Sequence, residues 1–381
     1  MKVLFIDFDL PQFLRDAEHP VGGWCIQLNL MLRELSRHGH RAGVLTWKSA
    51  NAYVGPQDVC DLVETYDPSE GIPKLRFFAR QAPAVLRMAR SYAPDILFQS
   101  CAGIQTGLMA FAARRLGIPF VHRIASNIDA DGGFRAHVPP SGRTPFRFGL
   151  RKADLIICQN DYQRDSMRER FPRKMLLQLG NMIEIPALPG GLKPRAQRSY
   201  VVWIGNFRFI KNLGLLNRLA RRLPEIEFRV AGHEAENPDP ETSAALASLK
   251  CLSNVRFLGY LNRAQVFSLL ADAAALLCTS RSEGFPNTFL EAFATGTPVI
   301  TPAGVDPNSM IALNKLGFTF SDETGAAESL RRLWTMPSGE FNEFATRCRD
   351  YVVANHSPAT VSARLVPALE RLVREFEERH K

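Results

Sequence analysis

Residues 281–300 read RSEGFPNTFLEAFATGTPVI, and they decide both the fold and the candidate site. Two carboxylates, Glu283 and Glu291, stand with seven residues between them, across the start of a predicted helix. Upstream, residues 274–279 form the continuous apolar run that a fully buried parallel strand shows. Residues 297–301 are predicted as the next strand. The loop of this strand–loop–helix–strand unit therefore lies at the carboxyl edge of a sheet, where open α/β sheets bind ligands.

The boundaries of the predicted helix follow from residue types. Gly284 and Pro286 interrupt the apolar run and start a turn. Asn287 or Thr288 is expected to cap the helix, because short polar side chains bond the free N–H groups of a first turn. Gly296 is expected to end the helix, since glycine adopts the left-handed conformation of a helix stop without strain.

The chemistry of this loop suits a nucleotide-sugar. The N–H groups at the start of the helix, with the positive end of its dipole, can hold phosphate without a metal. Glu291 can accept bonds from two ribose hydroxyls, and Glu283 from the hydroxyls of a hexose. The alternative is a capped helix with two solvated glutamates. The flanking strands favour the ligand site, whose expected donor-binding residues are Gly284, Phe285, Pro286, Asn287, Thr288 and Glu291.

The segment resembles the E-x7-E motif of the retaining, GT-B-fold glycosyltransferases of family 4 (the glycosyltransferase group 1 family). The resemblance runs through the whole chain and is strongest over residues 201–300. It implies two Rossmann-like domains that face each other across a cleft, with the active site in the cleft. The implied boundaries are 1–188 for an N-terminal acceptor-binding domain, 189–358 for a nucleotide-sugar-binding domain, and 359–381 for a C-terminal helix that crosses back to the first domain.

The alternation of strand and helix patterns independently predicts an α/β fold with parallel sheets. Strands are expected at residues 3–6, 43–46, 95–98, 120–124 and 155–158, and again at 200–204, 227–231, 255–258, 274–278 and 298–301. A connector rich in proline and glycine, residues 186–194, separates the two series. Amphipathic helices are expected at 25–38 and at 359–379.

Two cations follow the strand at 200–204. Arg208 offers a fork that matches two phosphate oxygens, and Lys211 offers a point charge. Such donors stabilise the charge that grows on a departing nucleoside diphosphate. The loop resembles the family's Gly-Arg-(loop)-Lys element, with Asn206 at the usual arginine position, so the resemblance implies that Arg208 serves instead. Glu283, Arg208 and Lys211 are thus the expected catalytic residues. The alternative is a solvated basic turn.

Other donor-side residues rest largely on the resemblance. Gly22 and Gly23 precede a predicted helix, where paired glycines let the backbone approach a ligand. The resemblance implies that they cover the diphosphate. It also implies that His233 and Tyr260, at the ends of two later strands, line the base and ribose. His233 is equally compatible with an ordinary loop position.

The chain departs from the family near residue 125. Many members carry a histidine there that faces the transferred sugar, and here the position falls near Ala125 or Ser126. His122 lies in mid-strand with opposite side-chain parity, so it is a weak sugar or acceptor candidate, and a core position is expected. Ser126 or Asn127 is expected to bond the sugar. Retention without a covalent protein nucleophile tolerates this change, because the leaving phosphate can accept the acceptor's proton.

Bulk properties predict a cytoplasmic globular protein. The chain has 381 residues, 46% of them hydrophobic, and no apolar run of the ~20 residues that a membrane helix needs. The N-terminus is predicted as a strand rather than a signal peptide. Seven cysteines without a C-x-x-C pair indicate free thiols in a reducing compartment. No metal is expected, since helix dipoles and the two cations can handle the phosphates.

The net charge of +9 is concentrated in two acid-free stretches, residues 74–90 and 135–152, in which phenylalanines alternate with cations. This pattern suits the surface of an anionic membrane, so a polyprenyl- or other lipid-linked acceptor is a candidate substrate. A solvated basic helix face is the alternative. Nucleic acid is not expected, because no binding motif accompanies the charge.

Together these observations predict a retaining, metal-independent hexosyltransferase that uses a UDP- or GDP-sugar. Its expected acceptor is a glycan or a lipid-linked glycan in bacterial surface polysaccharide or lipopolysaccharide assembly. The protein is expected in the cytoplasm, and it is a candidate for peripheral binding to the cytoplasmic face of the inner membrane. Two alternatives remain: a nucleotide-sugar 2-epimerase of the same fold, and a non-catalytic protein that binds nucleotide-sugars or polyanions.

Overall fold

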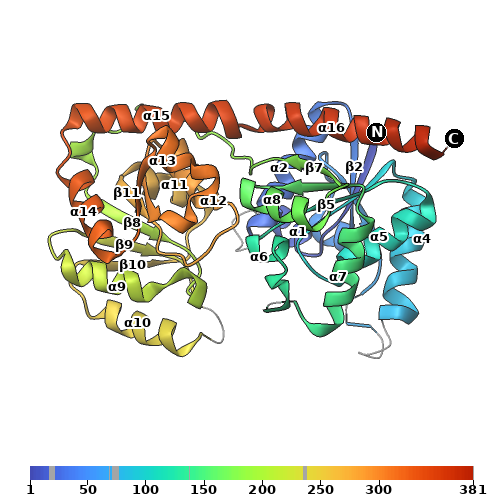
Figure 1. The fold of residues 1–381 in the computed structure, drawn as a ribbon, viewed down its shortest axis with the longest axis horizontal. Helices are drawn as coiled ribbons and strands as arrows, with labels where there is room; N and C mark the ends of the chain where they lie inside the picture. Colours follow the sequence, from blue (N-terminus) through green and yellow to red (C-terminus); the bar gives the residue numbers. More distant parts are fainter. Residues whose placement is uncertain (17–21, 68, 71–76, 137, 235–237, 381) are drawn as a thin grey trace. The chain divides into compact units, whose positions relative to one another are not determined.

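A computed structural model describes residues 1–16, 22–67, 69–70, 77–136, 138–234 and 238–380. The chain forms two compact units, one of Met1–Met182 with Pro358–Lys381 and one of Ile183–Ser357. Each unit contains one parallel sheet with helices packed against it (Figure 1). The predicted α/β class with two Rossmann-like units is confirmed. None of the described helices combines the length and the apolar character needed to cross a membrane.

Within the described residues, the first sheet has seven parallel strands in the order β3-β2-β1-β4-β5-β6-β7. The strands are β1 (Lys2–Ile6), β2 (Arg41–Thr46), β3 (Asp61–Glu64), β4 (Ile96–Ser100), β5 (Phe120–Arg123), β6 (Leu155–Cys158) and β7 (Met175–Gln178). The helices are α1 (Leu10–Arg15), α2 (Gly23–Arg37), α3 (Ala50–Val54), α4 (Ala82–Tyr92), α5 (Ile104–Leu116), α6 (Asn127–Ala130), α7 (Pro140–Lys152), α8 (Asp161–Arg170) and α16 (Pro358–His380), with short turns η1 (Phe77–Gln81) and η2 (Gly133–Ala136).

Both faces of this first sheet are covered, which explains the continuous apolar runs of its strands. Val3 and Phe5 of β1 belong to the core cluster that includes side chains of α2 and α16. Leu4 and Ile6 belong to the cluster on the other face, with side chains of α4, α5 and α7. Successive strand residues thus enter opposite cores.

In the part of the second unit that the structure describes, the sheet has six parallel strands in the order β10-β9-β8-β11-β12-β13. The strands are β8 (Tyr200–Ile204), β9 (Phe228–Ala231), β10 (Val255–Gly259), β11 (Ala273–Leu277), β12 (Val299–Pro302) and β13 (Gly317–Phe320). The helices are α9 (Leu213–Arg222), α10 (Pro240–Lys250), α11 (Arg263–Ala271), α12 (Asn287–Ala294), α13 (Met310–Asn314), α14 (Glu323–Trp334) and α15 (Ser338–His356), with short turns η3 (Arg195–Gln197), η4 (Phe209–Lys211), η5 (Ala303–Val305) and η6 (Pro307–Ser309).

All ten predicted strands are present, with bounds that differ by up to two residues. Three further strands, β3, β7 and β13, were not predicted. Each is an edge strand of its sheet, paired on one side only. None of these three strands is buried along its whole length, so its apolar run is short or interrupted. The fourth edge strand, β10, was nevertheless predicted.

The expected cap of α12 was wrong in its position. The N-cap is Pro286, whose backbone is extended (φ −65°, ψ 122°), and no side chain bonds the first turn as a cap. Neither Asn287 nor Thr288 fills that role, because proline fixes φ and the helix starts directly after it. The predicted stop is confirmed, since Gly296 adopts a left-handed φ of +67° just beyond the helix.

Candidate active site

Three glycines tie together the loops at the carboxyl edge of the second sheet. Gly232 after β9 has φ +144°, and a Cβ there would lie 1.9 Å from the carbonyl oxygen of Gly205. Its N–H donates to the carbonyl of Gly259 (2.8 Å), and the N–H of Gly205 donates to that of Ala231 (3.0 Å). Any side chain at Gly232 would force these backbones apart. The loops after β8, β9 and β10 therefore start from a fixed edge.

Lys211 and Glu283 meet at this edge, as the end of η4 approaches the loop after β11. The Lys211 Nζ lies 2.5 Å from Oε1 of Glu283, and the Ser280 hydroxyl donates to the same oxygen (2.7 Å). Their side chains are 26% and 18% exposed, so solvent still reaches the pair. Two residues expected to act together are thus in direct contact.

Further hydrogen bonds fix the two loops that carry this pair. The indole N–H of Trp203 donates to the Thr279 hydroxyl (2.9 Å), which donates in turn to the carbonyl of Lys211 (2.7 Å). The N–H of Arg281 donates to the carbonyl of Ile210 (2.8 Å). Sequence reasoning missed Trp203 and Thr279, whose roles depend on contacts between distant segments.

Glu291 lies in the second turn of α12 and is 8% exposed. Burial raises the pKa of its carboxyl, and the positive charge of Arg263 opposes that rise. Arg263 begins α11, and its Nε and Nη2 are buried without a hydrogen-bond partner among the described residues. Its Nη1 lies 3.9 Å from Oε2 of Glu184. Arg263 was not among the predicted site residues, because a single arginine at a helix start carries no recognisable signal.

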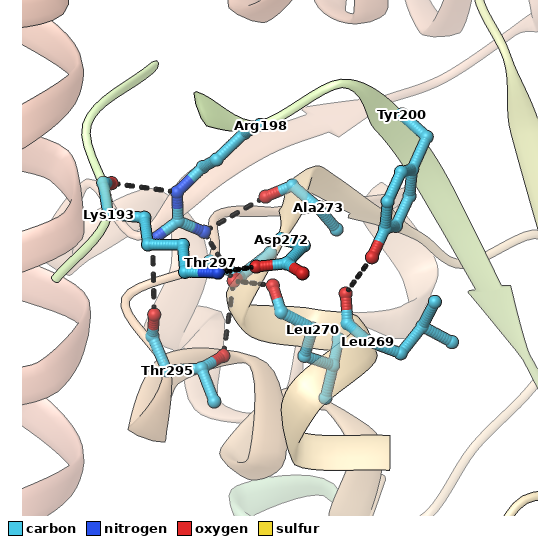
Figure 2. A network of polar contacts seen from close by, with 9 residues as sticks. All are labelled: Lys193, Arg198, Tyr200, Leu269, Leu270, Asp272, Ala273, Thr295 and Thr297. Carbon is cyan, nitrogen blue, oxygen red and sulfur yellow. Dashed lines mark hydrogen bonds and ion pairs between the residues drawn. The ribbon is translucent and has the colours of Figure 1, made fainter. Parts of the chain in front are cut away.

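Figure 2 shows how a buried arginine holds the C-terminal end of α12 against the sheet. The Arg198 guanidinium donates to the carbonyl of Ala273 (2.9 Å), the hydroxyl of Thr297 (2.8 Å) and the carbonyl of Thr295 (3.2 Å). Its Nε donates to the carbonyl of Lys193 (2.9 Å). Burial lowers the pKa of Arg198 to about 10, so it remains charged at neutral pH. This network connects the helix that carries Glu291 to the start of β11.

The other predicted donor-side residues of the second unit lie in neighbouring loops. Arg208 is exposed directly before η4, and no side-chain partner is recorded for it within the described residues. It does not join the Lys211–Glu283 contact. His233 and Tyr260 are both exposed, with ring centroids 6.4 Å apart in an edge-on arrangement. The carbonyl of His233 also accepts the N–H of Phe207 (2.9 Å), which connects the β8 and β9 loops.

The loop before α12 lies mostly inside the protein. Gly284, Phe285 and Pro286 are buried, and Asn287 and Thr288 are half-buried in the first turn. Phe285 belongs to the core cluster of this unit rather than to its surface. Its side chain therefore anchors the loop, and the contact predicted for a donor would come from the backbone.

Gly22, Gly23, Ser126 and Asn127 belong to the first unit. Gly22 caps α2 with an ordinary extended backbone, and a Cβ there would meet nothing within 4 Å. Ser126 precedes α6 and makes no side-chain cap bond. The Asn127 side-chain oxygen accepts from the amides of Asn160 (2.9 Å) and Gln163 (3.1 Å) at the start of α8. Asn127 is thus part of a structural network.

His122 is completely buried in β5. Its Nδ1 lies 2.9 Å from Oε1 of Gln99, and its ring meets the edge of Phe146 at 5.6 Å. Burial lowers its pKa to about 3, so the ring is neutral under ordinary conditions. Its surroundings are those of a core residue, and its candidacy as a sugar contact is not supported by this position.

Two family models match the chain. Residues 22–181 match a glycosyl transferase 4-like domain, and residues 198–336 match the glycosyl transferases group 1. Glycogen synthase of Mycobacterium tuberculosis is 27% identical over 159 residues, which cover 40% of this chain and 38% of that protein. The match therefore spans well under half the length of that relative.

Solved structures resemble the whole chain. Sucrose-phosphate synthase of Thermosynechococcus elongatus has a TM-score of 0.74 at 15% identity, over 98% of this chain and 100% of its own. Anabaena HepE in complex with UDP and glucose has a TM-score of 0.72 at 16% identity, over 97% of this chain and 100% of its own. The lipopolysaccharide outer core galactosyltransferase WaaB has a TM-score of 0.66 at 17% identity, over 97% of this chain and 99% of its own.

The two parallel sheets and these structural likenesses define the GT-B class. The two domain matches together span residues 22–181 and 198–336, so the chain belongs to the glycosyl transferases, and its residues 198–336 match group 1.

Proposed function

We propose that the protein is a retaining glycosyltransferase that moves a hexose from a UDP- or GDP-sugar to a glycan or lipid-linked acceptor without a metal ion. The observation that carries the proposal is the contact of Lys211 with Glu283, in the same unit as the buried Glu291 of α12. Membership of the glycosyl transferases supports the reaction class. The UDP and glucose bound by the similar HepE support the class of donor.

Acidic and basic residues of the site would bind different parts of the donor. Glu291 would accept bonds from the ribose hydroxyls, while Lys211 and Arg208 would bind the diphosphate beside the start of α12. In the structure Glu283 holds the Lys211 ammonium. Phosphate oxygens offer that ammonium an alternative anionic partner, which would release Glu283 to accept bonds from the sugar hydroxyls. His233 and Tyr260 would flank the base.

The transfer itself needs no protein nucleophile. The bond between the anomeric carbon and the leaving phosphate oxygen breaks, and a bond from the acceptor oxygen forms on the same face. The acceptor's proton passes to the leaving phosphate oxygen. Negative charge on the diphosphate grows during this step, and the cations of Lys211 and Arg208 stabilise it.

The proposed acceptor belongs to the assembly of a bacterial surface polysaccharide or lipopolysaccharide, at the cytoplasmic face of the inner membrane. WaaB, one of the similar structures, is named as an outer core galactosyltransferase of lipopolysaccharide. The net charge of +9 supports a meeting with an anionic lipid surface.

A panel of UDP- and GDP-sugars tests the proposal by thermal shift, with and without a chelator. The right donor should raise the Tm by a few degrees, because only the folded state binds it. Glu291→Ala should abolish the shift, and Glu328→Ala, an exposed glutamate of α14, should not. A panel in which no nucleotide-sugar shifts the Tm would contradict the proposal.

The anomeric configuration of the product, followed by NMR, separates the alternatives. Transfer with retention supports the proposal. A 2-epimerase would change the sugar without an acceptor, and a binding protein would shift the Tm without turnover. Loss of activity in the chelator would contradict metal independence.

A further inference from the structure

An open apolar cavity lies between three helices of the first unit, far along the chain from the residues of the donor site. It has a volume of about 430 Å³ and is lined by η1, α4, α5 and α7, through side chains that include Phe77, Leu108, Phe111, Pro145 and Phe148. Phe111 is 42% exposed, which is unusual for so large an apolar side chain. Figure 1 shows α4, α5 and α7 on one side of their sheet.

Close helix packing forms this cavity. A Cβ on Gly107 of α5 would lie 2.6 Å from the Cβ of Pro145 on α7, and one on Gly149 would lie 2.6 Å from Thr106. The two helices therefore touch through their backbones at these glycines. Their larger apolar side chains, Phe111 and Phe148, line the space that remains.

The helices around the cavity carry charge of one sign. Neither η1, α4, α5 nor α7 contains an aspartate or a glutamate, and together they contain nine cations: Arg80, Arg87, Arg90, Arg114, Arg115, Arg143, Arg147, Arg151 and Lys152. Arg80 has an exposed ion pair with Glu70 (3.5 Å), and Arg143 is bonded to carbonyls. No ion pair is recorded for the other seven within the described residues.

Three of these cations lie close to the apolar lining. The guanidinium of Arg115 lies over the ring of Phe111, 5.3 Å from its centroid. Arg147 and Arg151 are on α7, within one turn of Thr144 and Phe148 of the cavity. With Arg170 of α8 they line a second cavity of about 300 Å³.

We propose that this cavity receives an acyl chain of an anionic glycerophospholipid, with Arg115, Arg147 and Arg151 at the level of its phosphate. The inference rests on the proposed function, because lipid binding would bring the enzyme to an acceptor at a membrane. A lipid of this kind has a hydrocarbon chain that fits the apolar cavity and a phosphate that can pair with the nearby cations. A nucleic acid would match the charge but leave the apolar cavity unfilled.

Vesicle binding by the full-length protein tests the proposal without any sugar donor. Binding to vesicles of phosphatidylcholine mixed with phosphatidylglycerol is compared with binding to phosphatidylcholine alone. The mixed vesicles should bind the protein at least about tenfold more tightly, because each cation near an anionic surface contributes a factor of about five. Equal binding to both would overturn the proposal.

Variants separate the cavity from the charge. Phe111→Asn, which adds no charge, should weaken binding to the mixed vesicles about tenfold or more, whereas Leu313→Asn, at a 76% exposed leucine of the second unit, should not. The double change Arg147→Ala with Arg151→Ala should weaken binding about 25-fold. Arg374→Ala on α16, whose neighbours include glutamates, should cost much less. Circular dichroism melts check that each variant folds.

The remaining outcomes decide between occupants. Dihexanoyl phosphatidylglycerol, below its micelle concentration, should raise the Tm of the protein, and glycerol phosphate should not. Binding that is unchanged by Phe111→Asn would mean contact by charge alone and would overturn the proposal. A dimer in light scattering that Phe111→Asn dissociates would assign the cavity to a second copy instead. Vesicle binding by a protein that binds no nucleotide-sugar would refute the proposed function and leave the lipid site standing.

Discussion

Lys211 and Glu283 stand 72 positions apart in the chain, yet they form one contact in the second unit. Lys211→Met should lower kcat by about 10²- to 10³-fold, because it removes a cation aimed at the leaving diphosphate. Lys250→Met, an exposed lysine at the end of α10, is the matched control. Steady-state kinetics on the preferred donor measures the effect. An unchanged kcat in Lys211→Met would show that this ammonium does not stabilise the leaving diphosphate.

Asp7 offers a test of buried charge in the first unit. Burial raises its pKa from 3.8 to about 6, although the N–H groups of Leu10 and Asp9 donate to its carboxylate. The folded state therefore binds the proton more tightly than the unfolded state does. The stabilisation is complete below pH 4 and is lost as the pH rises through 6, at a cost of about 2 to 3 kcal/mol.

Asp7→Asn should remove that pH dependence, because an amide can accept the same two bonds without a charge. The free energy of unfolding, measured in urea between pH 4 and pH 7, should fall less steeply in the variant than in the wild type. Asp58→Asn, at an exposed position, should leave the slope unchanged. Parallel slopes for Asp7→Asn and the wild type would show that Asp7 is ionised in the folded state throughout.

The C-terminal end of α12 is held in place by Arg198, a residue outside the helix. Arg198→Met should destabilise the protein by about 3 kcal/mol or more, since it leaves the carbonyls of Thr295 and Ala273 buried without their donor. Arg256→Met on the exposed side of β10 is the control. Chemical denaturation gives the stability. A loss below about 0.5 kcal/mol would mean that water replaces the guanidinium in this network.

The bounds of the helices and strands show what the local sequence can predict and what it cannot. The bounds of α12 and its stop at Gly296 follow from glycine and proline, whose backbone preferences act within a few residues. Its cap was misplaced by one residue, because Pro286 and Asn287 are both good helix starts. The edge strand β13 was not predicted, since three of its four residues are only partly buried.

At the scale of the molecule, the first unit is assembled from both ends of the chain. Leu369 of α16 is fully buried in the same core cluster as α2 and β1. Leu369→Ala should cost about 2 to 5 kcal/mol, the usual loss for a large buried side chain. Hydrogen exchange should show the lost protection in α2 and β1 and leave β8 to β12 unchanged. Glu377→Ala, exposed on the same helix, is the control. Equal losses in both units would contradict the expectation that the effect stays in the first unit.

The sequence by itself determined the α/β class, ten of the strands and the two glutamates around α12. These features depend on periodicity and on glycine and proline, which act over short distances. It also pointed to Lys211, because a cation after a buried strand is visible in the residue order.

Only the tertiary structure decided which groups meet. The Lys211–Glu283 contact, the Arg198 network and the position of Arg263 near Glu291 join segments that are separated by tens of residues. The apolar cavity beside Phe111 needs three helices and two close glycine contacts at once. Such features arise from packing between segments, and no local pattern of residues encodes the distance between two side chains.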